Sequence, residues 1–526
     1  MSFAPGGRLP WVRLGLVTAA ALAIHGYHLG VEDAEIYEPA AKRLLDPKLY
    51  PYATEFFLSH GHLSLFSPIL AWTSRLTHVS MDWTIFAWYF ATLFATIVSC
   101  WLLAAACFES TRARWSAVLI SAAVLTMPAT NTGLLLIDPY LTARSLSTPL
   151  TIFALASFLE RKYARVSIAV MVTAAIHPQM VVYLVFLTAV MWASEWKKAR
   201  ARKAEIEEPV PVMASMTALV TLAGTLPTGF HLAAASGAYR EALYSRDYFF
   251  LYNWEWYHWV GMLAPLAILA WFWRGERNRD PLRGTTEGFR RISFALIPFG
   301  LISIVVALIF SSSSAFDMFA RLQPLRSFHL ITIVFVVLLS GVLGEYLARR
   351  RPWVVGAVAI PLAVGMFFVA RSTYPSSPQI EWPSDTSSNA WVNALLWVRH
   401  NTPKDAIFAV DSRYFKDEGT DVHGFRSVSE RTALADYFKD GGVVSLFPDL
   451  APEWKQMSNA TYGLNHFTQA DFSRLQQQYP VVSWTVVHGS APQGLDCPYQ
   501  QRGYAVCRLA TMTALTSSGA KDYKGL

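Results

Sequence analysis

Long apolar runs separated by short basic clusters are the feature that most limits what this chain can fold into. Of its 526 residues, 53% are hydrophobic and only 15% are charged, whereas a soluble globular protein carries about 25% charged residues. A chain with so few charges cannot cover its surface in water, so much of that surface is expected to face membrane lipid. The sequence therefore predicts an α-helical polytopic membrane protein.

The lengths of the apolar runs predict how often the chain crosses the membrane. A spanning helix needs roughly 20 apolar residues, and about eleven transmembrane helices are expected on this basis. The candidate ranges are 11–29, 83–108, 115–131, 145–160, 166–177, 179–195, 211–231, 257–273, 292–311, 328–347 and 353–370. The run 61–79 contains Pro68 and Arg75, which favours a helix lying at the interface over a twelfth span.

The basic clusters between the runs predict the orientation. They comprise Arg8 and Arg13, Arg112 and Arg114, Arg161 to Arg165, Lys197 to Lys203, Arg274 to Arg291, and Arg349 to Arg351. With eleven spans, each cluster falls on the side of the N-terminus, and the positive-inside rule identifies that side as the cytoplasm. We expect a multi-pass protein of the inner (plasma) membrane with a cytoplasmic N-terminus. The net charge of +7 is modest, and no nucleic-acid partner is predicted.

Two domains are expected. Residues 1–370 would form the transmembrane domain, including an outer loop over 30–82, and the more polar residues 371–526 would form an extracytoplasmic α/β domain. In the latter, "NAWVNALLWVRHNTP" predicts a helix stopped by a proline, and "AIFAVD", "VVSWTVVH" and "YAVCRL" predict strands with some parallel pairing. The stretch "SERTALADYF" fits a strand or a helix equally well.

The four cysteines fall into two pairs. Cys100 and Cys107 lie in one apolar run and are expected to be small buried hydrophobic residues. Cys497 and Cys507 flank "PYQQRGYAV", a spacing that suits a hairpin closed by a disulfide in an oxidising compartment.

A cluster of acids follows the first apolar run, in "HLGVEDAEIYEPAAKRLL" at 28–45. Asp33 precedes a helical pattern that would lie flat on the membrane, with Pro39 either starting that helix or kinking it. Asp is a favoured N-cap residue, so one interpretation of Asp33 is a structural cap. The other is a carboxylate that performs chemistry at the membrane surface.

The stretch from Glu32 to Tyr37, of the form acid–Asp–small–x–x–Tyr, combines with the predicted topology to resemble the GT-C membrane glycosyltransferases. The tail "WVRHNTPKDAIFAVDSRYF…GFRSVSERTALADYFKD" also resembles the external domain of bacterial members. The resemblance implies transfer of a sugar from a polyprenyl-phosphate donor to an acceptor outside the cytoplasm, with Asp33 as the base and Tyr37 near the substrate. Glu32 and Glu35 are the alternative bases, because this chain lacks the commoner DD or DE start.

Such a reaction also needs cations for the donor phosphate. Arginine grips phosphate in a forked geometry, and Arg144, Arg321 and Arg326 lie near span ends on the predicted outer side, against the positive-inside trend. The alternative role for all three is contact with lipid headgroups. Asp138 would either pair with Arg144 or contact the substrate as a second acid.

Three weaker signals complete the picture. The aromatic block 248–260 is expected to be an interfacial belt or a sugar platform, where Glu255 and His258 would touch the substrate. His60 and His62 with Asp33 are weak candidates for a divalent metal, and no cofactor is certain. The rival function is a non-catalytic lipid-binding or accessory subunit with a partner in a membrane complex.

Overall fold

The computed structural model describes residues 9–201, 232–277, 282, 284–349 and 351–509. Contacts within the chain divide it into two compact units. The first unit comprises Met1–Tyr27, Ile85–Ala235 and Tyr244–Arg371, and the second comprises His28–Thr84, Ser236–Leu243 and Ser372–Leu526. The sequence had grouped the outer loop with the transmembrane helices, whereas residues 28–84 make their contacts with the C-terminal residues.

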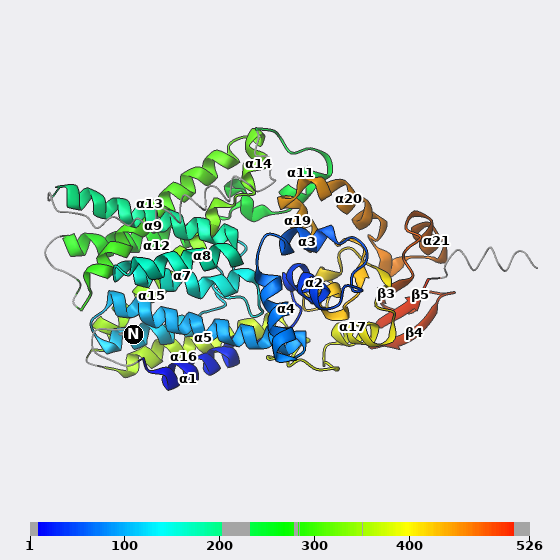
Figure 1. Cartoon of the computed structure of the whole chain (residues 1–526), viewed down its shortest axis with the longest axis horizontal. Helices are drawn as coiled ribbons and strands as arrows, with labels where there is room; N and C mark the ends of the chain where they lie inside the picture. Colours follow the sequence, from blue (N-terminus) through cyan, green and yellow to red (C-terminus); the bar gives the residue numbers. More distant parts are fainter. Residues whose placement is uncertain (1–8, 202–231, 278–281, 283, 350, 510–526) are drawn as a thin grey trace, which may run out of the picture. The chain divides into compact units, whose positions relative to one another are not determined.

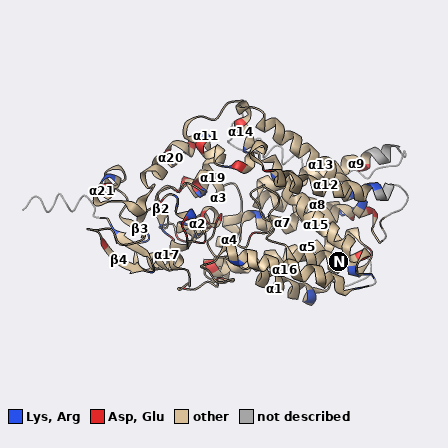
Figure 2. Ribbon diagram, turned by 180° about the vertical axis from the view of Figure 1, so that it is seen from behind, with Lys and Arg blue, Asp and Glu red and all other residues tan. Residues whose placement is uncertain are grey.

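The described part of the first unit is built from helices that pack side by side (Figure 1). They are α1 (Trp11–His25), α5 (Met81–Cys107), α6 (Thr111–Ala123), α7 (Ala143–Leu159), α8 (Tyr163–Ile176), α9 (Pro178–Ala201), α12 (Trp256–Arg277), α13 (Glu287–Ser311), α14 (Asp317–Ala320), α15 (Ser327–Tyr346) and α16 (Trp353–Thr373). Short 3₁₀ turns lie at Asp247–Phe249, Leu251–Asn253, Ser314–Phe316 and Pro324–Arg326. Figure 2 shows few charged residues along the long helices of this unit.

A helix covers most of each predicted span except two: in 115–131 the helix α6 ends at Ala123, and 211–231 lies outside the described residues. Five of the described helices are long and apolar enough to cross a membrane: α5, most of α9, α13, a helix over Pro324–Tyr346, and α16. Several others are shorter; α6, for example, has 13 residues and a length of roughly 20 Å, against a hydrocarbon core of about 30 Å. The multi-pass character is thus supported, but the count of eleven crossings is not confirmed.

Two glycines of α15 explain how closely this helix approaches Ser116 on α6 and Phe108 just before α6. A Cβ atom on Gly344 would lie 2.4 Å from the Cβ of Ser116, and one on Gly341 would lie 2.1 Å from the Phe108 ring. The Ser116 hydroxyl also donates to the Ser340 carbonyl oxygen at 2.7 Å. Small residues and interhelical hydrogen bonds are the usual means of packing membrane helices, which gain little from hydrophobic burial against each other.

The second unit contains a five-stranded sheet in the order β2-β1-β3-β5-β4. Its strands are β1 (Ile407–Val410), β2 (Thr432–Ala433), β3 (Trp484–His488), β4 (Asp496–Gln501) and β5 (Tyr504–Arg508). Strand β1 pairs in parallel with β2 and β3, with Phe408 opposite Ala433 and Trp484, while β5 runs antiparallel to β3 and β4. The three strands predicted from sequence are present, and the expectation of some parallel pairing is met by β1 and β3, whereas β5 is antiparallel to β3.

Helices make up most of the rest of the second unit. They are α2 (Ala34–Leu45), α3 (Glu55–Gly61), α4 (Phe66–Thr77), α11 (Gly237–Tyr244), α17 (Ala390–Asn401), α18 (Phe425–Ser429), α19 (Lys439–Leu446), α20 (Ala451–Ala460) and α21 (Gln469–Gln478). Helix α17 ends two residues before Pro403, as predicted, and the ambiguous stretch splits into the end of α18 and strand β2. Helix α4 has 12 residues and is too short to span a membrane.

Residues 28–84 are joined to the C-terminal residues by backbone contacts. The Glu32 amide donates to the Val422 carbonyl oxygen at 2.9 Å, and the Gly424 amide donates to the Gly30 carbonyl oxygen at 2.8 Å. Gly30 has a φ of +75°, and a Cβ atom there would also lie 2.8 Å from Val428. Glycine is therefore required for the loop to approach α18 this closely.

Candidate active site

The acidic segment places its carboxylates in unlike surroundings. Glu35 is 1% exposed; its Oε1 accepts hydrogen bonds from the Arg426 amide and Nε at 2.9 and 2.8 Å, and its Oε2 accepts one from the Ser427 amide at 2.9 Å. Both oxygens of Glu35 are thus used to fix α18 to α2. Such a carboxylate is poorly placed to accept a proton from a substrate.

Asp33 and Glu32 remain partly accessible, with side chains 31% and 36% exposed. Asp33 stands at the N-cap position of α2, but its side chain makes no capping hydrogen bond. Its Oδ1 instead pairs with the Lys439 ammonium at 3.0 Å, and Glu32 pairs with the same ammonium. The interpretation of Asp33 as a capping side chain is therefore wrong, although the residue does precede the helix.

Lys439 is the first residue of α19 and was not singled out from the sequence. Burial lowers the pKa of its ammonium, but the charges of Asp33 and Glu32 outweigh that effect and raise the pKa above the ordinary value for lysine. The ammonium also lies 5.9 Å from the centre of the Phe415 ring. A permanently charged lysine thus holds the two accessible acids together.

Next to Lys439 lies the buried guanidinium of Arg426, which shares Asp436 with it. Nη2 of Arg426 contacts both Asp440 oxygens at 2.6 and 2.7 Å and an Asp436 oxygen at 3.5 Å, and its Nε contacts Glu35. Burial and the neighbouring Asp440 raise the pKa of Asp436 well above its usual range. The cavity beside Arg426, at the carboxyl ends of β1 and β2, has no room for a sugar ring, so this arrangement is structural.

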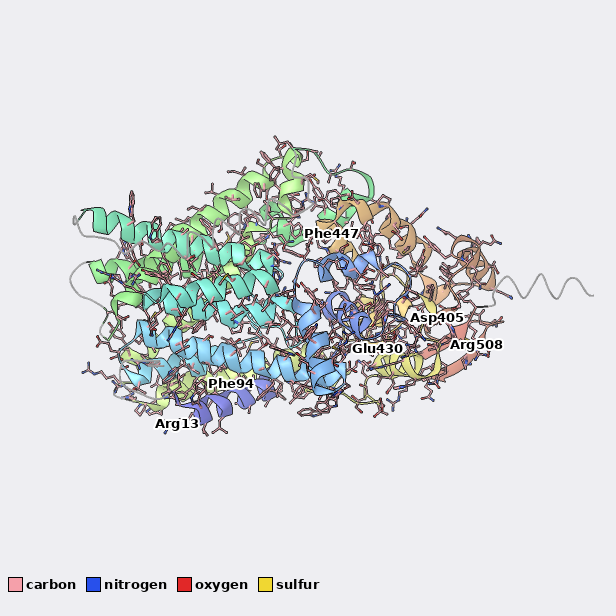
Figure 3. The ribbon with its side chains drawn as sticks, viewed as in Figure 1. Arg13, Phe94, Asp405, Glu430, Phe447 and Arg508 are labelled. Atoms are coloured by element: carbon pink, nitrogen blue, oxygen red, sulfur yellow. A yellow bond between two sulfur atoms is a disulfide. The ribbon has the colours of Figure 1, made fainter. Side chains whose placement is uncertain are left out.

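A second buried network involves α2. Nζ of Lys42 lies 3.4 Å from Glu38, 3.2 Å from Asp82 and 3.6 Å from Glu430, the last of which is labelled in Figure 3. Arg399 joins it through Asp82 at 2.7 Å and Glu430 at 2.9 Å. Burial, only partly offset by the nearby Lys42, raises the pKa of Glu38 to about 7.

Tyr37 and His60 belong to an aromatic cluster. The Tyr37 ring meets the His60 and Phe66 rings edge-on, with centroids 6.0 and 5.5 Å apart, and His60 also meets Phe447, labelled in Figure 3. Over the described ranges, no three His, Cys, Asp or Glu side chains gather in a way that could hold a metal ion. His60 and His62 therefore do not form with Asp33 the metal site that the sequence raised.

The arginines expected to bind phosphate lie in the first unit and differ in their surroundings. Arg144 is buried and paired with Asp138 at 2.6 Å, which bears out the simpler expectation for Asp138. Nε of the buried Arg321 donates to the Met318 carbonyl oxygen at 3.0 Å. Arg326 donates to Gln179 at 3.2 Å, and its Nε is buried without a hydrogen-bond partner among the described residues.

Arg326 is also close to two aromatic groups. Its guanidinium lies 5.8 Å from the centre of the Tyr248 ring. His329, buried in the first turn of α15, lies within electrostatic reach of both Arg144 and Arg326 and contacts the Leu136 carbonyl oxygen at 2.9 Å. Of the three predicted arginines, Arg326 is the one with a buried donor left to offer an anion.

The aromatic block in the first unit is exposed only in part, because Phe249, Phe250 and Trp254 are buried. Trp256 is 74% exposed and Tyr257 53%. The Glu255 amide donates to Nδ1 of His258 at 3.2 Å, so these two residues lie together where α12 begins. A belt at a membrane interface and a platform for a sugar ring both remain consistent with this exposure.

The two cysteine predictions are confirmed. A disulfide joins Cys497 on β4 to Cys507 on β5, and Cys100 and Cys107 are free and buried.

Sequence reasoning missed the partners of the acids. Arg426 and Arg431 belong to the stretch that resembles the family, but no role followed from the sequence. Arg431 donates to the carbonyl oxygens of Arg399 and Thr402 and so fixes the end of α17. Charged side chains interspersed with apolar ones over 425–440 were the available signal, because a charge that becomes buried requires a partner.

The chain is similar to two solved structures. One is the arabinofuranosyltransferase AftD from Mycobacteria, with a TM-score of 0.49 and 12% identity over 96% of this chain and 40% of that one. The other is ArnT from Cupriavidus metallidurans, with a TM-score of 0.37 and 10% identity over 95% of this chain and 97% of that one.

The chain thus spans less than half the length of the arabinofuranosyltransferase. No protein-family model matches the sequence, and no curated protein matches it.

Proposed function

We propose that this chain is a GT-C-type membrane glycosyltransferase, which moves a sugar from a polyprenyl-phosphate donor to an acceptor outside the cytoplasm. The observation that carries the proposal is the accessibility of the Asp33 carboxylate. It is partly exposed and ion-paired at the start of α2, while Glu35 and Glu38 in the same segment are buried and held by protein partners. Asp33 is thus the acid best placed to act on a substrate, with Glu32 beside it.

The chemistry assigned to Asp33 is that of a general base. Its carboxylate takes the proton of an acceptor hydroxyl as that oxygen forms a bond to the anomeric carbon of the sugar. The bond from this carbon to the phosphate oxygen breaks, and the electron pair leaves with the polyprenyl phosphate. A phosphate leaves without prior protonation, so one carboxylate suffices, and such proton transfer contributes roughly 10²–10⁴-fold to the rate.

The donor phosphate is assigned to the arginines of the first unit, with Arg326 foremost. Its buried Nε has no hydrogen-bond partner within the part of the chain that the structure describes, and an anion would satisfy it. Arg144 is already paired with Asp138, so we assign it only a supporting role, as a donor of further hydrogen bonds to the phosphate. Arg321 is the third member of this set.

The sidedness of the reaction is proposed on two grounds. The basic clusters favour a cytoplasmic N-terminus in an inner-membrane protein. The disulfide between Cys497 and Cys507 suits an oxidising compartment for the second unit. Asp33 belongs to that unit and would act there on an extracytoplasmic acceptor.

The test uses membranes that contain the whole chain and a set of radiolabelled polyprenyl-phosphate sugars. Asp33→Asn is expected to lower transfer by roughly 10²–10⁴-fold. Asp46→Asn is the matched control, because Asp46 is similarly exposed at 29% and pairs with Lys404 at 2.6 Å, yet has no assigned role. Full transfer by Asp33→Asn would disprove the base. If the unaltered chain consumes none of the donors, an accessory role is favoured instead.

A further inference from the structure

Lys439 contacts both accessible acids of the segment. Its ammonium reaches Glu32 and Asp33 from α19, more than 400 positions later in the sequence. The side chain is only 14% exposed, so its charge is largely removed from water. A buried ammonium is costly unless it is paired, and here the two acids supply the pairing.

The backbone of Lys439 is fixed independently of these acids. Its amide donates to Oδ1 of Asp436 at 2.6 Å, and the Phe438 amide donates to the same oxygen at 2.7 Å. Arg426 holds Asp436 and Asp440 in turn. The ammonium therefore projects from a rigid turn, which makes it a fixed point for any side chain that pairs with it.

We infer that Lys439 is a positioning residue, which holds the Asp33 carboxylate in place for proton transfer while Glu32 shares its charge. This inference rests on the proposed function, because it assigns Lys439 to the same site. The side chain does not react; it acts through Asp33. A carboxylate held by a fixed ammonium loses rotational freedom, and misplacement of a catalytic group by about 1 Å can cost 100-fold in rate.

The charges around Asp33 predict a second effect. Lys439 from α19 favours the charged form of Asp33, and Glu32 from the same loop disfavours it. The groups behind them, namely Glu35, Arg426, Asp436 and Asp440, pair with one another. Removal of Lys439 and removal of Glu32 should therefore move the acid limb of the activity profile in opposite directions.

The first experiment measures transfer against pH for the whole chain in membranes. Lys439→Met is expected to lower the maximal rate by about 100-fold and to move the acid limb up by about one pH unit. Glu32→Gln should move the acid limb to lower pH. Lys439→Arg, which keeps the positive charge, should retain most of the rate that Lys439→Met loses. A loss of rate in Lys439→Met with an unmoved limb, or without rescue by arginine, would mean that Lys439 serves only stability.

The second experiment does not depend on activity. Acetylation of individual lysines by acetic anhydride is followed by mass spectrometry in the whole chain. Lys439 should react slowly, and the double variant Glu32→Gln/Asp33→Asn should make it react at least about tenfold faster, as expected when a pairing worth one pKa unit or more is lost. Lys404, 61% exposed and paired with Asp46, is the internal control, and its rate of acetylation should be the same in both proteins.

The outcomes separate this inference from the proposed function. If Asp33→Asn abolishes transfer while Lys439→Met keeps the full rate and profile, the base stands and the role of Lys439 is refuted. If Asp33→Asn retains transfer, both fail, whatever the labelling shows. Unchanged labelling of Lys439 in the double variant would show that the ion pair does not form, and would refute the positioning role alone.

Discussion

At the scale of residues, one short segment shows how burial and partners decide what an acid can do. Glu35 is enclosed and satisfied by Arg426 and Ser427, so it serves as a structural anchor. Glu38 is equally enclosed but shares Lys42 with two other acids. Asp33 alone combines partial exposure with a place at the start of a helix, which is why we assign the chemistry to it.

Glu38 predicts how stability depends on pH. Its pKa rises on folding from 4.5 to about 7, so its contribution to stability is fully present below pH 4.5 and is lost as pH rises through 7. At 1.36 kcal/mol per pKa unit, the loss amounts to about 3 kcal/mol. The neighbouring charges also affect this pKa: Lys42 lowers it, whereas Asp82 and Glu35 raise it.

Thermal unfolding of the whole chain in one detergent, between pH 5 and pH 8, checks this expectation. The unaltered chain should lose stability as pH rises, and Glu38→Gln should show a flatter dependence because the amide does not titrate. Glu55→Gln, at an exposed position on α3, is the control and should follow the unaltered chain. An equally steep decline in Glu38→Gln would refute the assignment of the effect to Glu38.

At the scale of elements, the β4–β5 hairpin is stabilised by both its turn and its crosslink. Arg502 and Gly503 have φ values of +49° and +82°, as a two-residue type I′ turn requires. Strand β4 lies at the edge of the sheet and pairs only with β5 among the described strands. The disulfide between Cys497 and Cys507 therefore fixes an edge that has no second neighbour.

Removal of this disulfide should destabilise the second unit. A crosslink that closes a loop of 10 residues contributes about 2–3 kcal/mol, so the double variant Cys497→Ser/Cys507→Ser should unfold at a temperature lower by about 5–10 °C. Calorimetry with and without a reductant makes the comparison. The reductant should lower the transition of the unaltered chain and leave that of the double variant unchanged; an equal shift in both would contradict the prediction.

At the scale of the whole molecule, the second unit is assembled from distant parts of the chain. Residues 28–84 and the C-terminal residues share backbone hydrogen bonds and the buried pairs of Arg426 and Lys42. Loss of one partner from a buried ion pair costs about 3–5 kcal/mol, a large fraction of the 5–15 kcal/mol that stabilises a typical domain. The C-terminal segment is thus not an independent domain.

Residues 372–526 produced alone are accordingly expected not to fold. Arg426 would lose Glu35, and Lys439 would lose both of its acids. A fusion of residues 28–84 to 372–526 through a flexible linker restores these partners and should give a cooperative unfolding transition. Amide-proton NMR dispersion distinguishes the two proteins, and well-dispersed spectra from 372–526 alone would contradict this account.

The sequence by itself determined the helices of the first unit, the three strands predicted for the tail, and the disulfide. Each follows from local patterns: apolar runs of sufficient length, β-branched stretches between turns, and two cysteines at hairpin spacing. Each of these patterns involves only residues that lie close together in the sequence. They do not fix how many helices cross a membrane, because the lengths of α6 and α8 were decided by where the chain turns.

Only the tertiary structure decided which acid is accessible and which cations hold the others. Glu35 and Arg426 are 391 positions apart, and Asp33 and Lys439 are 406 apart. No local pattern encodes a pairing at such separations, because it depends on which surfaces the fold brings into contact. For the same reason the sequence did not single out Lys439, which is an ordinary lysine at the start of a short helix when its distant partners are unknown.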